Sequence, residues 1–164
     1  KREHLINKII DQKLNRNQLK EEMKGLYIEL VKNNKEQLKT IFSLLLDSKN
    51  YPVILEGITG KEEVAVVAFI LLRLLGVSES VAITDYMRSN EFIDLSSANT
   101  YAAQLSSRGQ EALTALLLAN KDYINAVIQA IKSDYGSIET YFIEGLGFAS
   151  KDIAKLQSTL LEIR

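Results

Sequence analysis

Apolar residues recur every three or four positions along most of the chain, the spacing that places side chains on one face of a helix. This pattern predicts a first amphipathic helix over residues 3–14 and a second over residues 18–31, with a break and an N-cap at residues 15–17. A third helix presents apolar side chains from Leu38 to Leu45 and ends in the polar residues that follow. Residues 1–50 therefore form a helical lead-in.

The same spacing continues after residue 62. Gly76 and Gly136 are well placed to end helices, because glycine readily adopts the conformation that follows a last helical turn. Residues 100–119 suggest a helix pair or a bent helix. The other expected helices are Glu62–Leu75, which is apolar almost all round, then Ser78 to about Ser89 with Ser78 as cap, Lys121–Tyr135 capped by Asn120, Ile138–Glu144, and a last one capped by Ser150 and ending near Ile163.

One short segment reads as a strand. Val53, Ile54 and Leu55 are consecutive apolar residues after Pro52, a pattern typical of a strand buried on both faces. A buried strand needs neighbours for its backbone donors and acceptors, and the sequence offers no second clear strand. We therefore predict a predominantly α-helical chain with about one clear β-strand, which either is a fragment of a larger protein or has lost a sheet.

Composition adds little to this picture. The 164 residues suffice for one domain (1–50 helical lead-in, 51–63 strand and loop, 64–164 helical body), and 46% hydrophobic with 25% charged residues is ordinary for a globular chain. The net charge of −1 gives no reason to expect nucleic-acid binding. The run Val64–Leu75 contains Arg73 and is far shorter than the roughly 20 residues of a membrane span. The chain starts at Lys1, and nothing decides between a cytoplasmic and a secreted location.

The loop after the expected strand is the main candidate site. Gly57 and Gly60 lie between a strand and a helix N-terminus, where unpaired backbone N–H groups and the helix dipole can hold an anion. Equally, the glycines permit a tight turn, and Glu62 and Glu63 favour the first turn of a helix. From the residues alone, this second, purely structural interpretation is favoured.

A family resemblance changes that balance. Residues 51–90, YPVILEGITGKEEVAVVAFILLRLLGVSESVAITDYMRSN, resemble the segment of bacterial tyrosine and dual-specificity phosphatases built around H-C-x-x-G-K-D-R-T-G. Gly60 and Lys61 match the Gly-Lys of that pattern, and Glu62 stands where the family has Asp. The stretches LLGV, DYMRSN, YGSIETY and EGLG follow in the family's order, so the resemblance covers roughly residues 26–164. It implies the helical part of an α/β phosphatase-like fold.

The departures from the pattern concern its chemistry. Gly57 takes the place of the nucleophilic Cys, Glu63 that of the phosphate-binding Arg, and Glu56 that of the His, while Val64 and Ala65 replace Thr-Gly. Cysteine phosphatases attack phosphorus with a thiolate, and this chain contains no cysteine. The resemblance thus implies a degenerate phosphate loop with no catalytic residue, made of Glu56, Gly57, Ile58, Thr59, Gly60, Lys61, Glu62 and Glu63.

The charge of the loop and the lack of an activating base or general acid also argue against phosphate chemistry. Three glutamates and one lysine give residues 56–63 a charge of −2, which repels phosphate. Lys61 can be engaged by a neighbouring glutamate, and Thr59 has no nearby histidine to activate it. The resemblance also implies an upstream general-acid Asp, and neither Asp11 nor Asp47 has a context that matches one.

The leading hypothesis is therefore a catalytically inactive phosphatase-like protein that binds or scaffolds. The alternative is a protein-tyrosine, dual-specificity or phosphoinositide phosphatase that retains activity by an unrecognised route, and a weaker third is a helical fragment whose enzymatic half lies elsewhere. No cofactor or metal is expected, since the adjacent Glu62 and Glu63 point in different directions and His4 reads as a solvated side chain. A protein partner or a homodimer could use the N-terminal helices, although self-docking of the stripe Leu5–Leu14 is favoured.

Overall fold

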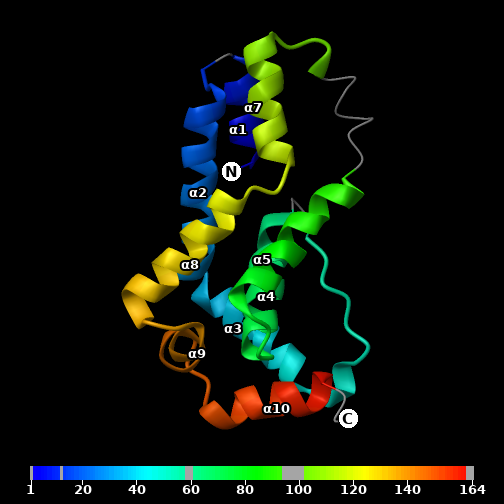
Figure 1. The fold of residues 1–164 in the computed structure, drawn as a ribbon, viewed down its shortest axis with the longest axis vertical. Coiled ribbons are helices and arrows are strands. Elements are labelled where there is room, and N and C mark those ends of the chain that lie inside the picture. The colour runs from blue at the N-terminus through cyan, green and yellow to red at the C-terminus, as the bar shows by residue number, and fades with distance from the viewer. Residues whose placement is uncertain (1, 12, 58–60, 94–101, 162–164) are drawn as a thin grey trace.

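Helices make up all the regular secondary structure in the computed structural model, which describes residues 2–11, 13–57, 61–93 and 102–161 (Figure 1). Two short 3-10 helices and one π-helix accompany the α-helices. The elements are α1 (Arg2–Ile10), α2 (Arg16–Lys32), α3 (Lys35–Leu46), the 3-10 helix η1 (Ser48–Asn50), α4 (Lys61–Leu74), α5 (Glu79–Arg88), the 3-10 helix η2 (Ser89–Phe92), α7 (Ser107–Leu117), α8 (Lys121–Tyr135), α9 (Ile138–Thr140), the π-helix η3 (Tyr141–Gly145) and α10 (Ser150–Leu160).

Several helices begin at the caps that the sequence predicts. The Asn15 side chain accepts a hydrogen bond from the Gln18 backbone N–H at 2.9 Å, and the Gln18 side chain accepts one from the Asn15 N–H at 3.0 Å. This reciprocal capping box satisfies two N–H groups that a helix start otherwise leaves unpaired. Ser78 and Asn120 likewise accept hydrogen bonds from the first turns of α5 and α8. The predicted caps Ser78 and Asn120 are confirmed, whereas α2 begins at Arg16, two residues before its predicted start.

The predicted β-strand is wrong. Val53–Leu55 is not a strand, and among the described residues the structure contains no sheet. The segment packs on one side only, because Val53 and Leu55 are half-buried against the core whereas the Ile54 side chain is 90% exposed. Three consecutive apolar residues therefore do not mark burial on both faces here. Since no described segment forms a ladder with this one, the expected α/β element of the fold is replaced by an all-helical arrangement.

Three other expectations change at helix ends. α1 ends at Ile10, so Leu14 is buried from a non-helical position. Ser150 is the first residue of α10 rather than its cap. The cap is Ala149, whose N–H donates to the Asp152 carboxylate at 2.8 Å, which places a negative charge at the positive end of the helix. The helix expected at 138–144 divides into α9 and the π-helix η3.

Helix α2 lies at the centre of the packing. It buries one side chain at every fourth position and packs against α7 and α8 along this stripe. α1 packs on α7 beside one end of α2, and α4 and α5 pack together beside the other end (Figure 1). The buried residues of the stripe are Leu19, Met23, Tyr27 and Val31.

The C-terminal elements are fixed to α2 and α3. The Tyr141 hydroxyl of η3 donates to the backbone carbonyl of Val31 at 2.7 Å. The Phe142 ring meets Phe42 of α3 edge-on at 5.3 Å and stacks on Phe148 at 4.4 Å between ring centroids. Aromatic pairs in these geometries stabilise packing beyond the area they bury. α10 then continues across α3 and α4.

Gly136, which follows the last residue of α8, allows a test of the backbone conformation at this helix end. Gly136 has φ +77° and ψ −42°, a conformation that strains any residue with a Cβ. We expect Gly136→Ala to lower the free energy of unfolding by about 1–3 kcal/mol, measured by urea denaturation. Gly25→Ala is the matched control. Gly25 lies inside α2 with nothing within 4 Å of an added Cβ, so this change should raise stability by up to about 1 kcal/mol. If the two substitutions changed the free energy of unfolding equally, the positive φ of Gly136 would be contradicted.

Candidate functional site

The candidate loop leads from the extended segment into α4. Glu56 is exposed and Gly57 is half-buried. Ile58, Thr59 and Gly60 lie outside the described residues, so the predicted cradle of backbone amides stays a prediction. α4 begins at Lys61, directly after these residues.

Lys61 contacts another helix. Its Nζ donates to the backbone carbonyl of Leu117 at 2.6 Å and lies 3.5 Å from that of Leu116, both in the last turn of α7. The last carbonyls of a helix have no intrahelical donor and carry the negative end of its dipole, so an ammonium group is a favourable partner there. Nζ also lies 3.7 Å from Oε1 of Glu62. The positive charge of the loop is thus engaged by α7 and by its own neighbour.

The two glutamates after Lys61 point in different directions. The Glu62 side chain is buried, with the residue only 8% exposed, whereas Glu63 is exposed. One carboxylate therefore lies against the core and the other in solvent. Among the described residues, no group of three or more histidines, aspartates and glutamates is placed to hold a metal.

Beside Glu62 lies a buried group of three tyrosines, the tyrosine cluster, formed by Tyr27, Tyr86 and Tyr123. The hydroxyls of Tyr27 and Tyr86 are 3.0 Å apart and share a hydrogen bond. The Tyr27 ring packs against those of Tyr123 at 5.5 Å and Tyr86 at 6.3 Å. The Tyr123 hydroxyl donates to the carbonyl of Ala115 at 2.9 Å. Each hydroxyl has a partner, as a buried polar group requires.

Burial sets the ionisation of the tyrosine cluster. Loss of contact with water raises the pKa of Tyr123 to about 12 and raises the pKa values of Tyr27 and Tyr86 above their ordinary value of 10.0. The negative charge of Glu62 raises all three further, as a smaller cause. The hydroxyls therefore remain protonated at neutral pH, and the cluster offers neither a base nor an anionic nucleophile.

Residues 117–120, from the last residue of α7 to the cap of α8, are held by three other elements, and we call them the α7–α8 turn. Nδ2 of Asn90 donates to the carbonyl of Ala119 at 3.0 Å, and the Ala119 N–H donates to Oδ1 of Asn90 at 2.6 Å. The Asn120 N–H donates to the Tyr86 hydroxyl at 3.3 Å. With the contact of Lys61 to Leu117, the α7–α8 turn is attached to α4, α5 and η2.

These contacts give a structural role to residues that sequence analysis noted without assigning one. Tyr86 and Asn90 belong to the stretch DYMRSN, and Lys61 to the Gly-Lys pair. Asn90 bonds to a backbone 29 residues away. No periodicity or capping pattern in a single sequence points to such a long-range pairing, so only the resemblance singled these residues out.

Comparison with known protein families identifies the family of the chain. A family model described as the tyrosine phosphatase family matches residues 2–162. The chain belongs to the tyrosine phosphatase family. The match begins upstream of residue 26, so α1 and α2 of this family member are part of the family pattern too. No curated protein matches the chain.

Family membership confirms the resemblance at that level only. The interpretation of residues 56–63 as a degenerate phosphate loop stays a prediction. For the described part of this family member, no helix has both the length and the hydropathy needed to cross a membrane.

The tyrosine cluster predicts a pH dependence. Between pH 10 and 12, tyrosine in the unfolded chain loses its proton while buried Tyr123 keeps it, so rising pH favours unfolding and the free energy of unfolding falls. Below pH 10 both states are protonated and this contribution is constant. We expect Tyr123→Phe to be less stable at pH 8 but to show a shallower decline from pH 10 to 12, measured by urea denaturation at each pH. A decline parallel to that of the wild type would contradict this role.

Proposed function

We propose that this protein is a catalytically inactive member of the tyrosine phosphatase family that acts as a binding or scaffolding module. The observation that carries the proposal is the absence of cysteine from the whole sequence. A thiolate is the attacking group of cysteine phosphatases, and glycine at position 57 has no side chain to replace it.

The charges of the loop support the proposal. Glu63 stands where the resemblance places a phosphate-binding arginine, whose planar fork would grip two oxygens of the phosphate. The one lysine of residues 56–63 is Lys61, and its Nζ lies on the α7 carbonyls. A phosphate dianion entering the loop would meet a net negative charge and would have to draw Lys61 away from α7.

We further propose that residues 1–164 act as one domain. Packing of α1 on α7 and of α10 on α3 and α4 supports this, because elements from both ends of the chain rest on elements from its middle. In a binding module of this kind, the family's helical scaffold serves to present surfaces, and the loop serves to join the extended segment to α4.

The alternative is a protein-tyrosine, dual-specificity or phosphoinositide phosphatase that acts by an unrecognised route, and the long family match is what favours it. An assay with p-nitrophenyl phosphate separates the two. We expect no turnover above background and no rise in melting temperature with phosphate or vanadate. Turnover that is lost in a folded Lys61→Ala variant would refute the proposal, because a contaminating phosphatase would not respond to that substitution.

Restoring two side chains tests which groups are missing. In the Gly57→Cys, Glu63→Arg double variant the side-chain charge of residues 56–63 rises from −2 to 0, before any ionisation of the new thiol. We expect vanadate to raise its melting temperature while turnover stays low, because no general acid protonates the leaving group. The control is Gly57→Ser with Glu63→Arg, which has the same charge without a thiol. Efficient turnover by the cysteine variant would show that the chain does supply an acid.

A further inference from the structure

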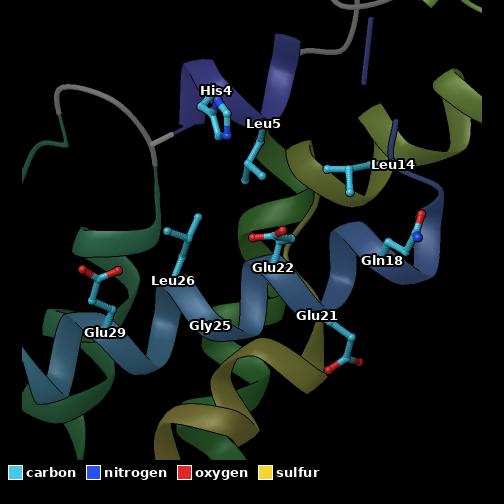
Figure 2. A pocket seen from close by; sticks show the side chains of 9 residues that line it. All are labelled: His4, Leu5, Leu14, Gln18, Glu21, Glu22, Gly25, Leu26 and Glu29. Carbon is cyan, nitrogen blue, oxygen red and sulfur yellow. The ribbon is translucent and has the colours of Figure 1, made fainter. Parts of the chain in front are cut away.

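We draw no further inference here: the strongest candidate, the groove between α1 and α2 (Figure 2), carries nothing, because Glu22 on its rim is already paired with Lys8 and nothing in the structure shows what occupies it.

Discussion

The hydrogen bond between Tyr27 and Tyr86 is the contact on which the arrangement of the helices depends most. Tyr27 is fully buried in the middle of the α2 stripe, where an unpaired hydroxyl would destabilise the fold. Its partner is supplied by α5, 59 residues further along the chain. The same ring packs on Tyr123 of α8, so α2, α5 and α8 meet at one side chain. The shared hydroxyl contact adds a directional constraint to the apolar packing of these helices.

Near these three tyrosines, residues that belong to the family's sequence pattern form hydrogen bonds between helices. Tyr86, Asn90 and Lys61 all bond to the α7–α8 turn. In contrast, the positions that the resemblance assigns to the nucleophile and the phosphate grip hold Gly57 and Glu63. The side chains that bond to the α7–α8 turn are thus different from those at the two positions where the chain departs from the family's pattern. The chain matches the tyrosine phosphatase family over residues 2–162 and contains no cysteine.

Local signals in the sequence were sufficient for most helices and for caps such as Asn15, because hydrophobic spacing and capping side chains act within a few residues. They failed where the outcome depends on distant neighbours. Val53–Leu55 has the composition of a buried strand, but a strand exists only with a paired backbone, and none of the described segments provides one. The cap at Ala149 was missed because its acceptor belongs to Asp152 rather than to the cap itself.

The candidate site was predictable to a smaller extent. The burial of Glu62 and the exposure of Glu63 follow from where the α4 face meets the core, which single-sequence reasoning could only suggest. The engagement of Lys61 with Leu117 joins residues 56 positions apart, beyond the reach of any local pattern. Residues 58–60, which decide whether the amides form an anion cradle, lie outside the described part of the chain.

The contact between Lys61 and the end of α7 has a mechanical consequence. α7 packs on both α1 and α2, so this contact joins the start of α4 to the helices at the N-terminal end of the molecule. A neutral side chain at position 61 would leave the last carbonyls of α7 without their cationic partner, while Tyr86 and Asn90 still held the same turn to α5 and η2.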